Sequence, residues 1–408
     1  MNALRFTSRI LTGLLFIFSG TVKAIDPLGS AYKFTDYFQA FHLHFLQNLA
    51  LPLAIMLCTA EFLAGLSVLT GYRQKEGIWL VMILMFIFTP LTFILAILNP
   101  VSDCGCFGDA IHLTNWQTFG KNIIILFFAL VVFMGRKRFE PVRTPKMEWT
   151  GISLAGILFA GFSLMNLRYL PLIDFLPYKK GASIPAEMKI PVGKPVDQYK
   201  TTFIYEKDGR KKEFTLENYP ANDSTWVFVD QKSVLVKKGY RPPIHDFSFA
   251  TLAGEDLTGQ ILADRGYNLL MISKKLGEAR PEKIREGFSL GKYCLSEGMG
   301  FHIITASGSD EIRNFGNADQ FCLADETTLK TMVRSNPGYM LLKGGIIMGK
   351  WSGAGLPAFS FFKKENLDSR TGRLNHRRYP LYIATGLLSL AIILLVTDTF
   401  LSRNKMKA

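Results

Sequence analysis

The sequence predicts a membrane α-helical bundle that carries an α/β domain outside the lipid. Three observations lead to this fold class. Of the 408 residues, 49% are hydrophobic and 20% are charged, whereas soluble domains carry roughly 25% charged residues. Six segments are apolar over the roughly 20 residues that a membrane-spanning helix needs. A long polar stretch, 171–379, separates the fifth of these segments from the sixth.

This composition excludes several classes of protein. Too much apolar surface needs burial for the chain to be wholly soluble or disordered. Five cysteines are too few for a scaffold held together by disulfides. The net charge of +14 raises nucleic-acid binding, but much of the basic charge clusters beside the apolar segments, and no basic motif is interleaved with aromatics elsewhere. We therefore expect no nucleic-acid partner.

The predicted spans cover residues 6–25, 49–70, 77–98, 117–135, 149–170 and 380–401. The first is not expected to be a cleaved signal peptide, because it is long, lacks a small-x-small cleavage site and is followed by further spans. Pro52 and Pro90 are expected to cap or kink their helices, which packed bundles tolerate. In the fifth span, small residues from Gly151 to Ala160 recur at four-residue spacing, which favours helix contact.

The basic residues beside the spans indicate the orientation. They form four clusters: Arg5 and Arg9; Arg73 and Lys75; Arg136, Lys137, Arg138, Arg143 and Lys146; and Arg403, Lys405 and Lys407. If every span crosses, all four lie on one side, which the positive-inside rule makes cytoplasmic. Arg377 and Arg378, before the last span, oppose this assignment. We expect a multi-pass protein of the inner membrane with residues 171–379 on the periplasmic side.

The first part of the external stretch, 171–245, is expected to be a β-rich linker region. Residues 201–216 are typical of a hairpin, with Asp208 and Gly209 supplying the turn. Two further short strands are expected over 224–230 and 232–240. We assign no chemistry to this region.

Residues 246–360 alternate strand and helix patterns in the order βαβαβαββ, which predicts a compact α/β domain with a mixed sheet. A leading hairpin is expected around Ala253 and Gly254. A helix over 327–336 is expected to begin at Thr327 or Thr328. The expected strands are 267–275, 300–307 and 321–326, followed by a hairpin that turns at Gly344 and Gly345.

This order, together with SNPGYMLLKGGIIMGKWS, resembles the thioredoxin-like fold. In that fold a proline, usually cis, precedes the fourth strand, and Pro337 occupies that position. The family's Cys-x-x-Cys follows the first central strand, where this chain has KKLGEARPEK; Cys294 and Cys322 lie elsewhere. Independent thiol-disulfide catalysis by this domain is therefore not expected. The resemblance implies a domain that docks a peptide or partner beside Pro337.

The sharpest motif lies between the third and fourth spans, where Cys104 and Cys106 flank Gly105. Two close thiols in an oxidising compartment favour a redox pair, and glycine tolerates the backbone of so small a ring. Asp103 and Asp109 would disfavour a thiolate, so activation needs another group, such as a helix N-terminus. Three interpretations stay open: a redox-active pair, a structural loop, and a metal site that adds His112.

Three segments resemble the DoxX/MauE-type family, whose MauE members are named for methylamine utilisation. They are FIFSGTVKAIDPLG, AEFLAGLSVLTGY and DCGCFGD with the following LTNWQTFGKN. The resemblance covers the four-helix unit over 1–135; a basic loop and the fifth helix follow over 136–170, and the last helix is 380–402. The resemblance to this family implies a role in disulfide formation in an exported partner, or in the maturation of that partner, with Cys104 and Cys106 as the functional pair. The unit is also similar to vitamin-K-epoxide-reductase-type oxidoreductases, which raises a quinone as the cofactor, although the chain lacks their Cys-x-x-Cys within a span.

Two ionisable residues, Glu61 and Lys23, lie inside predicted spans, where charges are costly and often functional. An ion pair between them is a hypothesis, because their heights differ by several ångströms at a rise of 1.5 Å per residue. A packing contact and a role with protons or a quinone both stay open. Lys121, near the start of the fourth span, is expected to extend outward to the interface.

Two functions compete on this sequence. In the first, Cys104 and Cys106 exchange electrons with an exported thiol protein, which the α/β domain holds nearby; tethering at both ends keeps that domain close to the motif. In the second, the protein is a non-catalytic membrane scaffold or assembly factor of the cell envelope. The retained Cys-Gly-Cys favours the first and the missing Cys-x-x-Cys favours the second. A transporter is disfavoured, because no inverted repeat is apparent.

Overall fold

The computed structural model describes residues 2–101, 103–138, 143–220, 223–315, 320–371 and 378–405. Within them it confirms the predicted fold class, with six helices long and apolar enough to cross a membrane and a separate α/β domain. The chain forms two compact units, Met1–Gly181 with Ser248–Ala408, and Ala182–Phe247. Arg377 and Lys407, which entered the orientation argument, lie outside the described residues.

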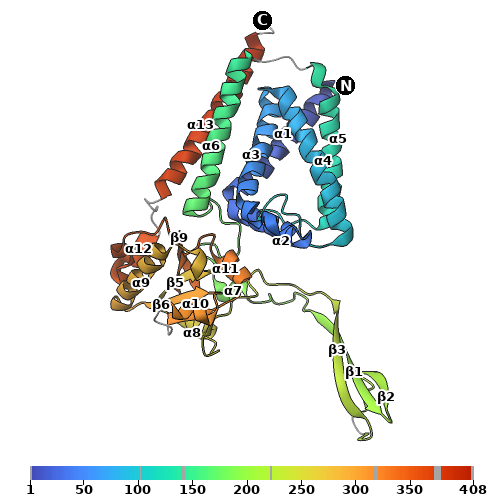
Figure 1. Ribbon diagram of the computed structural model, residues 1–408, viewed down its shortest axis with the longest axis vertical. Coiled ribbons are helices and arrows are strands. Elements are labelled where there is room, and N and C mark those ends of the chain that lie inside the picture. The colour runs from blue at the N-terminus through green and yellow to red at the C-terminus, as the bar shows by residue number, and fades with distance from the viewer. Residues whose placement is uncertain are drawn as a thin grey trace. The chain divides into compact units, whose positions relative to one another are not determined.

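The long helices reproduce the predicted spans, with ends that differ by a few residues (Figure 1). They are α1 (Asn2–Ile25), α3 (Ala50–Thr70), α4 (Gln74–Leu98), α5 (Asn115–Met134), α6 (Pro145–Tyr169) and α13 (Tyr379–Lys405). Helices α1 and α3 approach each other closely: a Cβ at Gly65 would lie 2.6 Å from the carbonyl oxygen of Gly13. Small residues therefore permit the contact that also brings the ionisable groups of these two helices together.

The segment after the first span is not the simple loop that the span boundaries predicted. It contains α2 (Pro27–Ala40) and a 3-10 helix (His44–Leu49). The Asp26 carboxylate caps α2 by accepting from the Gly29 N–H, and Pro27 occupies the first turn, where its missing N–H costs nothing. The helix was missed because it is short and half polar, so no membrane-length apolar pattern marks it.

The fifth and last spans, α6 and α13, lie side by side (Figure 1). The small residues of α6 serve this packing, because a Cβ at Gly151 would lie 3.0 Å from Leu395 of α13. On its other face α6 contacts α3, where the rings of Phe62 and Phe159 stack at 3.9 Å. Asp398 of α13 accepts hydrogen bonds from Arg143 and from Tyr72.

The smaller unit contains a short helix, α7 (Ile184–Glu187), and a sheet in the order β2-β1-β3. Its strands are β1 (Gln198–Lys207), β2 (Arg210–Thr215) and β3 (Val227–Lys237). The expected hairpin turns at Asp208 and Gly209, both at positive φ. The two further strands expected over 224–240 are one strand, because the polar residues 230–232 keep their pairing with β1 on this exposed edge and do not interrupt it.

The α/β domain has the mixed sheet that the sequence predicted, and its strand order is β4-β7-β6-β5-β8-β9. Its strands are β4 (Ala250–Thr251), β5 (Tyr267–Ser273), β6 (Gly300–Thr305), β7 (Phe321–Leu323), β8 (Gly338–Lys343) and β9 (Ile346–Ser352). Strands β5, β6 and β7 are parallel and β8 is antiparallel to β5. Every residue of β5 is buried, which explains its continuous apolar run.

The helices of this domain are α8 (Thr258–Ala263), α9 (Pro281–Ser296), α10 (Ser309–Arg313), α11 (Glu326–Met332) and α12 (Leu367–Thr371). The start of α11 corrects the prediction: its N-cap is Asp325, whose carboxylate accepts from the N–H groups of Thr327 and Thr328. The leading hairpin is reduced to β4 and a single bridge from Ala250 to Asp256. The peptide bond between Asn336 and Pro337 is cis, and β8 follows it directly.

Candidate functional site

The loop between α4 and α5 is held at its base by side chains. Asn99, at φ 47°, ends α4. Thr114 and Gln117 form a capping box at the start of α5, which satisfies two N–H groups of its first turn. The Asn115 amide donates to Asn99 Oδ1 at 2.8 Å and to the Val101 carbonyl at 2.9 Å. The loop that carries the cysteines therefore has a fixed base.

The two thiols of this loop face each other. Cys104 Sγ and Cys106 Sγ lie 2.8 Å apart, and both cysteines are free. Gly105 between them has φ +64°, and a Cβ there would also lie 2.9 Å from Lys33 Cγ, so glycine is required twice over. The Cys104 carbonyl accepts from the Tyr37 hydroxyl, and the Cys106 carbonyl from Ser19 Oγ at 2.8 Å. These bonds fix the pair on α1 and α2.

The surroundings make the two thiols unequal. A hydrogen bond from the Cys104 thiol lowers the pKa of Cys106 to about 6, against the opposing effect of burial, and the nearby ammonium groups of Lys121 and Lys23 act in the same direction. The same hydrogen bond and burial raise the pKa of Cys104. Cys106 is therefore the thiolate of the pair and Cys104 the protonated partner.

Lys121 corrects a prediction, because it does not extend outward. Its ammonium group lies 4.2 Å from the centre of the Phe107 ring, and it lines a cavity of about 20 Å³ together with Cys106, Lys23 and Glu61. A cavity of this size holds about one water molecule. Because the Lys121 ammonium group lies near Cys106 and not at the membrane interface, it can stabilise the Cys106 thiolate.

The acidic residues beside the cysteines were expected to oppose a thiolate, but cations compensate them. Lys33 lies 3.0 Å from Asp103, and Arg334 lies 2.5 Å from Asp109. Burial alone would raise the pKa of Asp103, but the hydrogen bond from His112 and the charge of Lys33 lower it to about 2. His112 thus pairs with Asp103, 3.8 Å away. Among the described residues no three His, Cys, Asp or Glu side chains gather as a metal site would need.

Lys23 and Glu61 form an ion pair directly below this loop. Lys23 Nζ donates to the two Glu61 oxygens at 2.6 and 2.8 Å, and both side chains are buried. Ser19 Oγ lies 3.0 Å from Glu61 Oε2 and also contacts the Cys106 carbonyl. The ion pair that was a hypothesis from the sequence is thus present in the structure. The Ser19 hydroxyl therefore lies between the Lys23–Glu61 ion pair and the backbone carbonyl of Cys106.

A second cluster of charges joins the α/β domain to the cysteine loop, and sequence reasoning missed it. Arg334 precedes Pro337 by three residues; its Nε donates to Asp26 Oδ2 at 2.8 Å and its Nη2 to Asp109 Oδ2 at 2.5 Å. Its guanidinium also lies 5.3 Å from the centre of the Tyr32 ring. The side chain is 7% exposed. Asp26 and Asp109 lie 308 and 225 positions before Arg334 in the sequence, so no local sequence pattern predicts these contacts.

The α/β domain has no thiol at the place where thioredoxin-like proteins carry theirs. After β5 stand Lys274 and Lys275, which pair with Glu278. Burial raises the pKa of Cys294 to about 12, with the charge of Glu297 adding to it, and burial raises that of Cys322 to about 11. Pro337 is buried, and the loop that contains it is held by Arg334.

Fold and site together define a class: a multi-pass membrane protein with a cysteine pair on an extramembrane loop and a thioredoxin-like domain that lacks its own pair. Residues 1–135 match the family model described as "Methylamine utilisation protein MauE". The membrane unit is therefore MauE-like, as the sequence resemblance indicated. Residues 199–238 match a model described as "Domain of unknown function (DUF8463)".

Comparison with individual proteins adds one curated relative. "Protein TlpB" of Flavobacterium psychrophilum is 29% identical over 133 residues, which are 32% of this chain and 36% of the relative. The match thus spans about a third of either protein. No solved structure matches the chain.

Proposed function

We propose that the protein is a membrane thiol-disulfide oxidoreductase that uses Cys104 and Cys106 to oxidise an exported thiol protein. The observation that carries the proposal is the facing pair of free thiols, 2.8 Å apart, of which one has a pKa lowered to about 6. Thiolate character and access to a partner sulfur are what disulfide exchange requires. The MauE-like unit that holds the pair supports the same function.

The unequal thiols indicate the direction of attack. In the oxidised protein, a thiolate of the exported protein attacks one sulfur of the Cys104–Cys106 disulfide, and the S–S bond breaks. The thiol of lower pKa leaves faster, so Cys106 departs as thiolate and the mixed disulfide forms at Cys104. A second thiol of the exported protein then displaces Cys104, leaving a disulfide in the substrate and a dithiol in the loop.

The α/β domain is proposed to position the exported protein. It contributes no reactive thiol, but Arg334 places the loop with Pro337 beside the loop with the cysteines. A partner chain bound along the Pro337 loop would then present its thiol close to Cys104. The anchors α6 and α13 on either side of the α/β domain keep its effective concentration near the pair high.

This chemistry also needs an oxidising compartment. The basic clusters support an inner-membrane location with 171–379 in the periplasm. Alkaline phosphatase fused after residue 240 tests this orientation: an active fusion supports it and an inactive one overturns it.

The central test is a trapped intermediate. In the Cys106→Ser variant, the Cys104 thiolate can attack the disulfide of an exported protein that is already oxidised, which is the reverse of the last step and needs no further oxidant. No Cys106 thiol is then present to displace that protein from Cys104, so we expect a covalent adduct on non-reducing gels after acid quenching. The Cys104→Ser variant should trap less, and the double variant none. If Cys106→Ser traps no adduct and supports the wild-type phenotype, the redox proposal fails.

The second candidate function, a non-catalytic scaffold or assembly factor, is favoured by the absence of a Cys-x-x-Cys in the α/β domain. It predicts that both thiols keep one redox state in cells whatever the oxidant, and that both Cys→Ser variants retain full activity.

A further inference from the structure

We infer that the protein binds a phosphate group in a basic cavity where α6 and α13 meet the α/β domain. The cavity has a volume of about 200 Å³, and the residues that directly follow α6 form part of its wall. Its lining includes four cations and one carboxylate: Lys180, Arg334, Lys350 and Arg378, with Asp174. This site is independent of the cysteine pair and of the proposed redox function.

Two of these cations have acidic partners that compensate them only in part. Lys350 Nζ lies 2.6 Å from Asp174 Oδ2. Arg334 is held by Asp26 and Asp109. Burial nevertheless lowers the pKa of Lys350, and the charge of Arg334 acts in the same direction, against the opposing effect of Asp174. The carboxylates present therefore do not offset the cost of keeping these cations out of water, and a bound anion would reduce that cost.

The other two cations contact backbone carbonyls instead of carboxylates. Lys180 donates to the Thr371 carbonyl, and Arg378 Nη2 donates to the carbonyls of Leu170 and Pro171 at 3.1 and 2.9 Å. The Nε of Arg378 is buried and has no hydrogen-bond partner within the described part of the chain. A buried donor without an acceptor is costly. A phosphate oxygen would accept from it, because the planar guanidinium matches phosphate geometry.

The place of the cavity in the chain favours a phospholipid as the source of the phosphate. Leu170 directly follows α6 and Arg378 directly precedes α13, and lipid headgroups lie at the level where spans end. Basic pockets between membrane helices bind such headgroups. Beyond Arg378, the exposed side chains of Ile383, Leu387 and Leu390 follow one face of α13, along which acyl chains can lie. The site also explains why Arg378 is basic although it opposes the positive-inside assignment.

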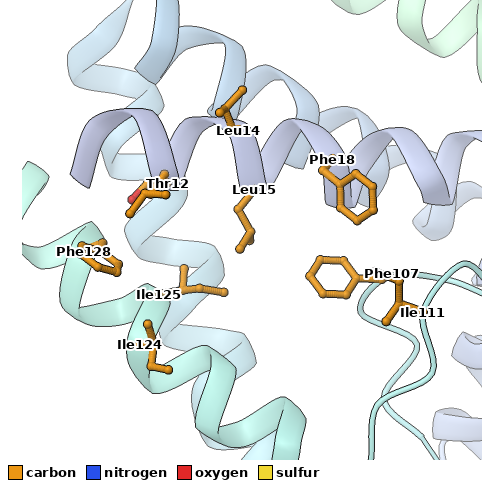
Figure 2. Close-up of a pocket in the computed structure, with 10 residues that line it drawn as sticks. Thr12, Leu14, Leu15, Phe18, Phe107, Ile111, Ile124, Ile125 and Phe128 are labelled. Carbon is orange, nitrogen blue, oxygen red and sulfur yellow. The ribbon is translucent and has the colours of Figure 1, made fainter. Parts of the chain in front are cut away.

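A second cavity, in the membrane unit, has the opposite character. It has a volume of about 460 Å³ and lies between α1, α5 and the end of the cysteine loop (Figure 2). Figure 2 shows Leu15 of α1 pointing toward Ile125 of α5, and Phe18 toward Phe107. Of the ten residues that line it, only Thr12 is polar. This cavity suits an acyl chain but offers no cation to a phosphate, so a test of the basic cavity needs a control lipid without phosphate.

Thermal unfolding of the full-length protein in dodecyl maltoside micelles measures the binding, because a ligand of the folded state raises the unfolding midpoint. Phosphatidylglycerol is compared with a galactosyl diacylglycerol, which has the same acyl chains and no phosphate, and sodium phosphate with sodium chloride of equal ionic strength. We expect phosphatidylglycerol to raise the midpoint and the galactolipid to leave it unchanged. In Arg378→Gln the concentration of phosphatidylglycerol that gives half of the shift should rise at least about tenfold, because charge-assisted hydrogen bonds are lost.

Two further variants complete the test. Lys180→Gln should weaken binding in the same direction, and it replaces Arg378→Gln should that variant not fold, since Lys180 is exposed. Lys146→Gln removes the same charge from an exposed position at the opposite end of α6 and should change nothing. A shift with sodium phosphate alone that Arg378→Gln or Lys180→Gln weakens supports the site and assigns it a soluble phosphate. Equal shifts with both lipids, shifts that neither of these variants weakens, or no shift with any addition overturn the inference.

Discussion

Cysteines in two regions of this molecule differ sharply. Cys104 and Cys106 lie on a polar loop, where a thiol hydrogen bond and the ammonium groups of Lys121 and Lys23 lower the pKa of Cys106 to about 6. Cys294 and Cys322 lie in the α/β core, where burial raises their pKa values to about 12 and about 11. The comparison shows that the residues around a cysteine, and not the thiol group itself, set its pKa and therefore its reactivity.

The α/β domain and the membrane unit also differ in which of them carries the reactive thiols. The α/β domain has a mixed sheet and a cis-proline before β8, the features on which its resemblance to the thioredoxin-like fold rests, but it has lysines where that fold would carry the reactive cysteines. The membrane unit has the thiols on a loop that its helices hold. A fold and the chemistry commonly associated with it are thus separable, and Arg334 brings the two regions together.

The largest expected effect is the difference in alkylation between the two regions. At neutral pH iodoacetamide should modify Cys106 at least about a thousandfold faster than Cys294, because only the thiolate reacts and the core excludes the reagent. Mass spectrometry of peptides from the reduced protein measures both rates, and unfolded protein serves as the control. Equal rates in the folded protein would remove the basis of the comparison.

Removing the link between the regions is expected to cost stability. Arg334→Ala removes the cation that pairs with the buried Asp26 carboxylate and the half-buried Asp109 carboxylate, a loss of about 3–5 kcal/mol. Unfolding in mixed micelles measures the change. Arg313→Ala is the control, since that side chain is 76% exposed and such pairs contribute less than about 1 kcal/mol.

Adding Asp26→Asn and Asp109→Asn to Arg334→Ala should restore part of the lost stability, because no charge is then left buried alone. A triple variant that is less stable than Arg334→Ala would contradict this explanation.

A smaller change is expected at the cysteine loop itself. Lys121→Gln removes a cation that favours the Cys106 thiolate, so the pH at which alkylation of Cys106 is half-maximal should rise by about one unit. The profile is followed as alkylation rate against pH. Lys137→Gln, in the 3-10 turn Arg136–Arg138 that follows the far end of α5, should leave the midpoint in place. An unchanged midpoint in Lys121→Gln would show that Lys121 contributes nothing to the lowered pKa of Cys106.

The smallest effect concerns Asp103. Its pKa is lowered to about 2 in the folded protein, below the ordinary value of about 3.9. A carboxyl group whose pKa is lowered on folding stabilises the folded protein at every pH above its ordinary pKa. This contribution is lost as the pH falls from about 4 through about 2. The unfolding midpoint of wild type should therefore drop more steeply over this window than that of Asp103→Asn. Parallel curves would show that Asp103 contributes nothing.

Hydropathy and periodicity predicted much of the fold, because they report local burial. The long spans and the buried strand β5 repeat apolar residues over many positions, and the Asp208–Gly209 turn has its own local signature. Helix α2 has no such length, and the charge-bearing polar residues 230–232 of β3 resembled a break. Local pattern could not distinguish an exposed continuous strand from two short ones.

The part of the candidate site that depends on local sequence could be predicted, and the part that depends on contacts between distant segments could not. The spacing of Cys104 and Cys106 is local and needs no fold to be seen. The direction of Lys121 and the clamp of Arg334 on Asp26 and Asp109 depend on contacts between distant segments. With one sequence, nothing marks such partners before the chain is folded.

The contact of Asp398 with Arg143 and Tyr72 has a consequence for assembly. Asp398 follows the α/β domain in the chain, so the ribosome has already released the residues of that domain when α13 is completed. The last helix can therefore join α6 only after the sheet-forming segments are available to fold. The partners of Asp398, one basic and one phenolic, stand on segments that are synthesised before the α/β domain.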